Sequence, residues 1–330
     1  MRRAGSPCLR RHRANPILTR ADIPDVPPAL VDATSVFNPG AVEAGGRTVL
    51  LLRVQARSRE TFTMVAESAD GVRFAVRPEI VELRGLEKLR ERVYHVYDPR
   101  VTRLEGAYHV LFAMDMDGAC GLGLARTEDL RAFDFLGLVS SDDVRNGVLF
   151  PEKVGGVYLR LERPNRARLE GGPTTGSEIW LAESDDLLRW RPRGPVMAGR
   201  FHYWDELIGS GPPPVKTRRG WLHLYHGVAT HFASANIYQA GVALLALDDP
   251  ARVLGRSRGN ILEPREPYEL AGQVPNVVFP SGMVVDEVDA EGFALPSSPV
   301  RIYYGAADTA VGLALTTVGE LLEAASEPPL

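Results

Sequence analysis

A unit of about 60 residues recurs five times along this chain, and a period of that length is typical of one four-stranded blade of a β-propeller. Each unit opens at a proline-marked strand start, continues into an apolar strand after a glycine-containing turn, and closes at an acidic or Ser/Thr turn. The openings lie at residues 37–42, 97–101, 150–154, 211–215 and 279–284. Because the first strands of radial blades meet around one axis, we expect the openings to converge on one pocket.

The rest of each unit is typical of short strands joined by tight turns. Segments rich in β-branched and aromatic residues predict the second strands, at 48–54, 108–113, 157–161, 221–225 and 301–304. The closings lie at 68–74, 127–133 and 184–190, with looser versions at 247–250 and 316–319. We expect residues 80–92 to form a short helix or an ordered insertion, and residues 319–325 to form a helix. The predicted fold is an all-β, five-bladed β-propeller with a short C-terminal helix.

Composition fits one closed unit of this kind. The chain has 330 residues, 45% of them hydrophobic, so it can bury a substantial core, and its 32 glycines and 25 prolines suit many tight turns. Length alone would allow two domains, but a propeller of this size is a single domain, which we place at residues 15–330. Residues 1–14 are basic and lack the apolar segment of a secretory signal, so we predict a disordered tail there.

Charge and cysteine content argue against several classes of protein. A formal net charge of -4 gives no electrostatic reason to bind nucleic acid or an anionic membrane, and no apolar run approaches the length of a membrane span. The two cysteines, Cys8 and Cys120, are too few for a disulfide scaffold and lack the spacing of a metal site. These features predict a cytoplasmic protein without a bound metal.

Asp98 is the first candidate for chemistry, because it directly precedes Pro99 at the start of an innermost strand. Proline has no N–H to donate and so favours the first residue of a strand, which would aim the Asp98 carboxylate into the axial pocket. The structural alternative is an Asx turn that only opens the strand. Polar residues at the other openings are expected at the same end of the channel: Asn38, Glu152, Lys153 and Ser281.

Basic and aromatic residues form two further groups beside the inner strands. Arginine offers a planar fork for phosphate or carboxylate, and histidine can donate to an anion near neutral pH. A ring of such residues predicts an anion site, with inter-blade ion pairs as the alternative: Arg53, Arg100, Arg145, Lys153, Arg163 and His226. Aromatic rings can stack on sugars, although most pack between blades. This group comprises Tyr97, Trp180, Trp204, Tyr225, Tyr303 and Tyr304.

A series of motifs runs in order through nearly the whole chain. They are YDPRV at 97–101, NGVLFPEK at 146–153, RP at 163–164, IGSGPPP at 208–214 and YHGV at 225–228. The segments VPNVVFP at 274–280 and YYGAADT at 303–309 extend the series. Together, these motifs resemble those of glycoside hydrolase family 130.

The resemblance implies a propeller enzyme that acts on β-mannosides. Members are mostly inverting phosphorylases that release α-mannose 1-phosphate, and a minority are hydrolases. By this resemblance Asp98 is the general acid, and in the phosphorylases its proton passes through a sugar hydroxyl. The resemblance also implies inorganic phosphate as co-substrate and no metal or organic cofactor. It implies phosphate binding by Arg53, Arg145, Asn146, Arg163 and His226, and substrate binding by Asn38, Arg100, Lys153, Tyr225 and Asp308.

One position departs from the family pattern. Leu207 stands where the phosphorylases usually carry Lys or Arg before the Ile-Gly pair, and a leucine cannot pair with phosphate. The neighbouring Glu206 is a candidate base for water, and Glu162 stands where a neutral or basic residue is common. We favour phosphorolysis because the rest of the phosphate-binding set is retained, with inverting hydrolysis of a β-mannoside as the alternative.

Two other functions are compatible with a five-bladed propeller. A furanosidase of the arabinanase or invertase kind would need an early-blade Asp as base and a later Glu as acid, which the motif order does not supply. A non-catalytic carbohydrate-binding propeller would use Asp98 and its neighbours only as ligand contacts. The rim loops at 80–92 and 230–236 would select the linkage and the acceptor sugar, and a homo-oligomer is compatible with the sequence.

Overall fold

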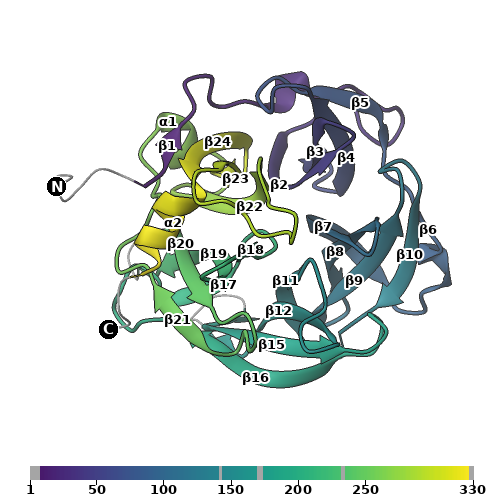
Figure 1. Cartoon of the computed structure of the whole chain (residues 1–330). Coiled ribbons are helices and arrows are strands. Elements are labelled where there is room, and N and C mark those ends of the chain that lie inside the picture. The colour runs from purple at the N-terminus through teal and green to yellow at the C-terminus, as the bar shows by residue number, and fades with distance from the viewer. Residues whose placement is uncertain (1–7, 141–142, 169–173, 232–234, 327–330) are drawn as a thin grey trace.

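The computed structural model describes residues 8–140, 143–168, 174–231 and 235–326. In these residues, five sheets of four or five strands surround a central axis, and one further sheet has two strands (Figure 1). Each large sheet runs outward from an innermost strand and its neighbours pair antiparallel, apart from one short parallel edge strand. The predicted five-bladed propeller is confirmed.

The first two blades follow the chain directly. Blade 1 consists of β2 (Ser35–Ala44), β3 (Arg47–Gln55), β4 (Thr61–Ser68) and β5 (Ala75–Ile80). Blade 2 consists of β7 (Val93–Leu104), β8 (Ala107–Met116), β9 (Ala119–Thr127) and β10 (Phe133–Leu138). The predicted insertion between them contains β6 (Leu83–Arg84), which pairs with β10, and a 3-10 helix (Leu86–Lys88); another 3-10 helix lies at Arg20–Asp22.

Blades 3 and 4 each carry an additional short element. Blade 3 consists of β11 (Val144–Leu149), β12 (Tyr158–Pro164), β15 (Glu178–Ser184) and β16 (Arg191–Ala198). The separate pair β13 (Ala167–Arg168) and β14 (Thr174–Thr175) lies between β12 and β15 in the chain. Blade 4 consists of β17 (Leu207–Ser210), β19 (Gly220–Ala229), β20 (Ile237–Leu245) and β21 (Val253–Arg256), and β18 (Val215–Thr217) pairs with β19.

Blade 5 joins the two ends of the described chain. It consists of β22 (Val278–Val285), β23 (Pro299–Ala306), β24 (Ala310–Thr317) and, at its outer edge, β1 (Arg10–Arg11). The short helix α1 (Pro267–Leu270) precedes this blade and α2 (Val318–Ala324) follows it, which confirms the predicted C-terminal helix. No helix among the described residues is long and apolar enough to cross a membrane.

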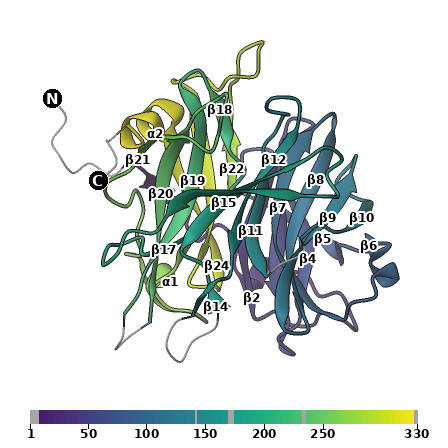
Figure 2. The ribbon, with the colours of Figure 1, turned by 90° about the horizontal axis from the view of Figure 1, so that it is seen from below.

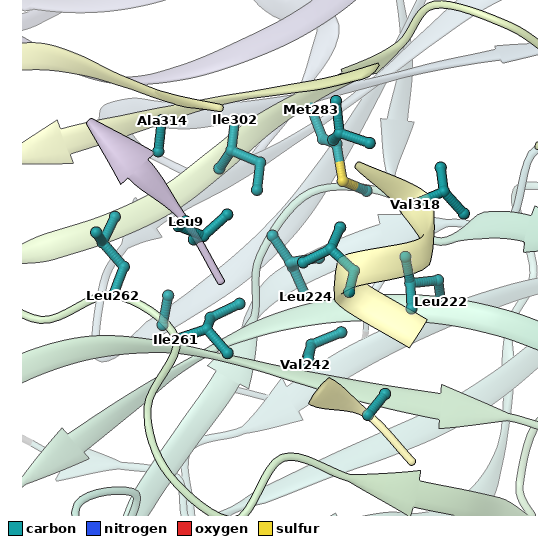
Figure 3. Close-up of a cluster of buried hydrophobic side chains, with 14 of the residues drawn as sticks. Leu9, Leu222, Leu224, Val242, Ile261, Leu262, Met283, Ile302, Ala314 and Val318 are labelled. Carbon is teal, nitrogen blue, oxygen red and sulfur yellow. The ribbon is translucent and has the colours of Figure 1, made fainter. Parts of the chain in front are cut away.

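The N-terminal strand corrects the predicted boundary of the tail. Arg10 and Arg11 pair with Leu315 and Ala314 of β24, and Leu9 is 1% exposed. Leu9 packs into the largest hydrophobic cluster, between side chains of blades 4 and 5 that include Leu224 and Ile302 (Figure 3). Burying one leucine side chain contributes about 2 kcal/mol toward holding this strand against blade 5. The disordered tail predicted at 1–14 is therefore wrong for residues 8–14, and residues 1–7 lie outside the described chain.

The unit closings of blades 1 to 3 are side-chain-capped turns, as the sequence pattern predicts. In blade 1, the Ser68 hydroxyl accepts from the Gly71 amide at 2.9 Å, and Asp70 Oδ1 accepts from the Arg73 amide at 2.8 Å. Thr127 and Asp129 make the corresponding bonds in blade 2. In blade 3, Ser184 accepts from the Asp186 amide and Asp186 accepts from the Arg189 amide. A short side chain that accepts from the following amides ends the strand and turns the backbone.

Candidate active site

Residues of all five blades converge on one cavity of about 310 Å³ at the axis, the axial pocket. Its walls are formed by residues near the starts of the innermost strands and by residues near the ends of the second strands. Residues of the adjacent segments complete them. Two of its lining residues, Arg163 and Val274, lie close in the chain to β13 and α1. The elements α1 and β14 lie at one end of the ring and β18 at the other (Figure 2). The lining residues are Asn38, Arg53, Tyr97, Asp98, Asp115, Arg145, Asn146, Arg163, His226, Tyr238, Val274, Val277, Phe279 and Asp308.

The inner strands of blades 1 to 3 share one local conformation at this pocket. Asn38, Asp98 and Asn146 each have positive φ, at 46°, 53° and 53°, and each lies at a register shift of its inner strand. Asn and Asp tolerate the left-handed region better than most residues, so the bulge places a short polar side chain at the same point of each blade. The proline or glycine that follows is the sequence signal for this bulge.

Asp98 is held by the neighbouring blade. Its Oδ1 accepts from Arg53 Nη1 at 2.9 Å and from Asn38 Nδ2 at 3.1 Å. Burial acts to raise the pKa of Asp98, but the charges of Arg53 and Arg100 and the hydrogen bonds from Asn38 and Arg53 outweigh it, so the pKa lies below its usual value. In the free protein Asp98 is an ionised carboxylate aimed into the pocket.

Asp308 lies in the same pocket with the opposite shift. Burial raises the pKa of Asp308 to about 6, with the positive charge of Arg53 opposing the shift and the negative charge of Asp98 adding to it. It follows Ala307 in the turn between β23 and β24, where both residues have left-handed backbone. The two carboxylates therefore titrate in different pH ranges, a kind of difference that separates acid and base roles in many hydrolytic sites.

The blade 3 and blade 4 side of the pocket is basic. Arg145, Arg163 and His226 line it beside Asn146. Burial, together with the neighbouring Arg145, lowers the pKa of Arg163 to about 10. Burial and the charges of Arg163 and Arg100 hold the pKa of His226 well below 6.5, so its imidazole is neutral.

Several buried polar atoms on this side have no hydrogen-bond partner among the described residues. They are the donors Nε of Arg145 and Nε of Arg163, and Nδ1 of His226, which donates or accepts according to the tautomer of the ring. Buried polar groups are nearly always paired in native proteins, so unpaired polar atoms that line a cavity suit a ligand that can pair with them. Two guanidinium groups beside a neutral imidazole suit a phosphate-sized anion.

The predicted site residues Asn38, Arg53, Asp98 and Asp308 thus lie together with the basic set, whereas Lys153 does not. Lys153 Nζ lies 3.5 Å from Oε1 of Glu105 and packs over the ring of Tyr158. Glu105 follows Leu104, the last residue of β7, so this contact is away from the bulge that carries Asp98. The prediction placed the blade 3 opening at 150–154, but β11 covers Val144–Leu149, so Pro151 marks the end of the inner strand. The predicted sugar contact of Lys153 does not fit this position.

Arg100 and Tyr225 lie behind the pocket instead of lining it. Arg100 is buried, and it donates from Nε to the Gly211 carbonyl at 2.8 Å and from Nη1 to the Asp98 carbonyl at 3.2 Å. Tyr225 is fully buried and donates its hydroxyl to Asp205 at 2.9 Å. Both positions support the walls of the site, and the predicted direct contacts with substrate do not fit them.

Glu206 and Leu207 also lie outside the pocket lining. Glu206 Oε2 accepts from the hydroxyl of Thr230. Leu207 is buried on β17, two residues before Gly209, so both point to the same face of the strand. A Cβ at Gly209 would lie 2.5 Å from the His226 ring, which shows that this face is directed at the basic side. A longer basic side chain at 207 would extend toward the same region.

Asp115 and Tyr238 line the pocket but were not selected from the sequence. In blades 1 and 3, the second-strand residue that pairs with the residue before the bulge is an arginine, Arg53 or Arg163. In blade 2 the equivalent residue on β8 is Ala113. Asp115 is two residues further along the same face, so comparison of the repeated units at this offset would have found it. It accepts from the Tyr97 hydroxyl at 2.7 Å. The described residues contain no group of three His, Cys, Asp or Glu side chains arranged to hold a metal ion.

Comparison with known proteins places the chain in a class of carbohydrate-active enzymes. Residues 8–327 match the family described as beta-1,4-mannooligosaccharide phosphorylase. The chain is 31% identical to the beta-1,4-mannooligosaccharide phosphorylase of Ruminococcus albus over 320 residues, which cover 95% of this chain and 89% of that protein. It is 30% identical to the 1,2-beta-oligomannan phosphorylase of Thermoanaerobacter over 308 residues, which cover 88% of this chain and 92% of that protein.

A solved structure agrees with the sequence comparison. The beta-1,2-mannobiose phosphorylase of Listeria innocua, in complex with beta-1,2-mannobiose, superposes with a TM-score of 0.82 at 26% identity, covering 96% of this chain and 99% of that chain. The chain belongs to glycoside hydrolase family 130, the β-mannoside phosphorylase family.

Proposed function

We propose that this protein cleaves a β-linked manno-oligosaccharide by inverting phosphorolysis and releases α-mannose 1-phosphate. The observation that carries the proposal is the division of the axial pocket into two halves. A carboxylate held by Arg53 and Asn38 lies on one side, and a basic set with unpaired buried donors lies on the other. A single displacement needs a proton donor on one face of the sugar carbon and a nucleophile on the other.

Asp98 supplies the proton to the leaving oxygen, directly or through a sugar hydroxyl. Its pKa is depressed in the free protein by Arg53 and Arg100, so bound sugar and phosphate must favour the protonated form before cleavage. The bond between the mannose carbon and the leaving oxygen breaks as a phosphate oxygen bonds to that carbon. The proton carried by hydrogen phosphate then replaces the one that Asp98 donated, so the reaction is balanced without another reactant.

The basic side holds the phosphate in this scheme. Arg145 and Arg163 each have a buried Nε donor without a partner among the described residues, and the neutral His226 can contribute a hydrogen bond without a full charge. Curated relatives at about 30% identity carry out phosphorolysis of β-1,4- and β-1,2-linked manno-oligosaccharides, which supports phosphate as the nucleophile.

Inverting hydrolysis of a β-mannoside is the second candidate, and Leu207 is the observation in its favour. Without a basic residue at this position, the anion loses one charge-assisted hydrogen bond, worth about 1.5–3 kcal/mol. The candidate base Glu206 is bonded to Thr230 and does not line the pocket, which weakens this alternative.

The proposal is tested by incubating the protein with β-1,2-mannobiose and β-1,4-mannobiose, each with and without inorganic phosphate. Phosphorolysis predicts mannose 1-phosphate only when phosphate is present. Equal release of free mannose in both conditions would establish hydrolysis. Saturable sugar binding without turnover on either disaccharide would establish a carbohydrate-binding propeller instead.

A further inference from the structure

β1, the strand that closes the ring, is bonded to α1, the helix that precedes one wall of the axial pocket. β1 lies at the outer edge of blade 5, near α1 (Figure 1). Its Arg11 forms an ion pair with Glu269 of α1. Nε and Nη2 of Arg11 donate to the two carboxylate oxygens of Glu269 at 2.8 and 2.7 Å. This two-pronged ion pair ties the beginning of the described chain to the helix that precedes the pocket wall.

Glu269 is a buried point where several elements meet. Its side chain is 0% exposed, and it also accepts from the Tyr304 hydroxyl at 2.8 Å and from the amides of Arg265 and Glu266 at 2.8 and 3.0 Å. Burial acts to raise the pKa of Glu269, but the bonds from Arg11 and from these two amides keep it below the usual value. The carboxylate is ionised and fixed, so α1 is held rigidly at this point.

Backbone hydrogen bonds lead from Glu269 to the pocket. The Glu269 carbonyl accepts from the Val277 amide at 3.0 Å, and the Val277 carbonyl accepts from the Ala307 amide at 3.1 Å. Val277 lines the axial pocket, and Ala307 precedes Asp308, which also lines it. Two successive backbone hydrogen bonds therefore connect Glu269, the partner of Arg11 in the ion pair, to the turn that carries Asp308.

The turn that carries Asp308 depends on this support. Ala307 and Asp308 have φ of 47° and 49°, a conformation that is unfavourable for alanine in particular. The Val274 amide donates to the Ala307 carbonyl at 3.2 Å, and the Gln273 amide donates to Thr309 Oγ1 at 2.9 Å. The segment 273–277 is thus bonded to the turn at three points, and it is anchored to α1 at its other end.

From this chain of contacts we infer that Arg11 and Glu269 are positioning residues for Asp308, so that closure of the ring by β1 fixes the wall of the pocket that carries Asp308. Neither residue touches the pocket, and the inference concerns how the site is held, not the reaction. Only its kinetic test rests on the proposed function.

The test compares Arg11→Lys with Arg10→Lys, the same substitution on the adjacent residue of β1. Lysine keeps the positive charge but cannot make the two-pronged contact with Glu269. Arg10 is a matched control because it forms an exposed ion pair with Glu320 and no bond with α1. Glu269→Gln is the second variant, because it retains the size of the side chain if Arg11→Lys does not fold.

We expect faster deuterium exchange in Arg11→Lys at two places, residues 271–279 and 303–311, with the other blades unchanged. On the proposed substrate, the KM for β-mannobiose should rise about ten-fold while the KM for phosphate changes by less than about two-fold. Arg10→Lys should match the wild-type protein in both measurements.

Exchange that is uniform across the ring, or equal in the two variants, would overturn the inference and leave Arg11 as a general stabilising residue. Equal rises in both KM values would also overturn it. If the wild-type protein turns over no β-mannoside, the proposed function fails, and the exchange measurement still decides whether Arg11 positions the Asp308 turn.

Discussion

Asn38 and Asp98 occupy equivalent positions in consecutive blades, and their side chains meet in the axial pocket. Asn38 Nδ2 donates to Asp98 Oδ1 at 3.1 Å, and both residues have left-handed backbone at a bulge of the inner strand. The repeated unit therefore places one blade's amide against the next blade's carboxylate. Arg53 donates to the same oxygen at 2.9 Å, so blade 1 sets the orientation and charge of the proposed acid on blade 2.

Asp98→Asn should lower the turnover of a β-mannoside by about 10²- to 10⁴-fold, because the amide keeps the shape of the carboxylate and cannot donate the same proton. The fold should persist, since the substitution retains size and suits the positive φ. Turnover and the melting temperature are measured on the same preparation. A folded variant with near wild-type turnover would make Asp98 a structural residue.

Arg145→Ala and His226→Ala should each weaken phosphate use more than sugar binding. Both residues lie on the basic side of the pocket, and a lost hydrogen bond to a charged group costs about 1.5–3 kcal/mol, or roughly 10- to 100-fold in affinity. Initial rates at varied phosphate and varied disaccharide separate the two KM values. Arg126→Ala, which removes an exposed ion pair with Glu128, is the control.

The opposite pattern, with the loss confined to the KM for the sugar, would remove Arg145 and His226 from the anion site. An equal loss in the Arg126 control would point to general destabilisation instead.

Leu207→Lys should lower the KM for phosphate by restoring a charge-assisted contact, because residue 207 shares a strand face with Gly209 beside the His226 ring. Glu206→Gln should leave phosphorolysis unchanged, because Glu206 bonds to Thr230 outside the pocket lining. Both variants are assayed with and without phosphate. If Glu206→Gln instead abolishes release of free mannose, water is the nucleophile and Glu206 its base.

Asp308→Asn should make the protein more stable near pH 7 than the wild type. The pKa of Asp308 is raised in the folded state, from 3.8 to about 6, so the folded state binds more protons than the unfolded state between these values. Stability from this group is therefore complete below pH 4 and is lost as pH rises through about 6. The variant removes this loss, which is on the order of 3 kcal/mol.

Urea unfolding of the wild type and Asp308→Asn at pH 4 and pH 7 measures this effect. The difference between the two proteins should grow with pH. A difference that is constant across this range would show that Asp308 ionises normally in the folded state.

The sequence predicted the blades better than it predicted the blade openings. The turn that closes a blade is determined by hydrogen bonds to nearby side chains such as Ser68 and Asp70, so its position could be predicted from the local sequence. The predicted opening of blade 3 at residue 150 lies about six residues after the start of β11, because Pro151 follows the inner strand whereas Pro39 and Pro99 lie within theirs. In this blade the bulge is formed at Asn146-Gly147, where glycine replaces the proline.

Site residues could be predicted from the sequence where a motif lies at a position that the repeat brings to the axis. They could not be predicted where side-chain packing sets the direction of the residue. Asp98 lies at the bulge of an inner strand, Arg53 near the end of a second strand and Asp308 in the turn after β23, and the repeat brings all three to the axis. Lys153 and Tyr225 are close to site residues in sequence, but Lys153 pairs with Glu105 and the Tyr225 hydroxyl bonds to the buried Asp205. Strand ends and side-chain direction depend on register, which single-residue patterns do not fix.

The most direct test of the central claim is the anomeric configuration of the first product formed from β-mannobiose and phosphate, followed by nuclear magnetic resonance. A single displacement by phosphate from the basic side, opposite Asp98, predicts α-mannose 1-phosphate from the earliest time points. Formation of the β-anomer, or of free mannose at a rate indifferent to phosphate, would contradict the account.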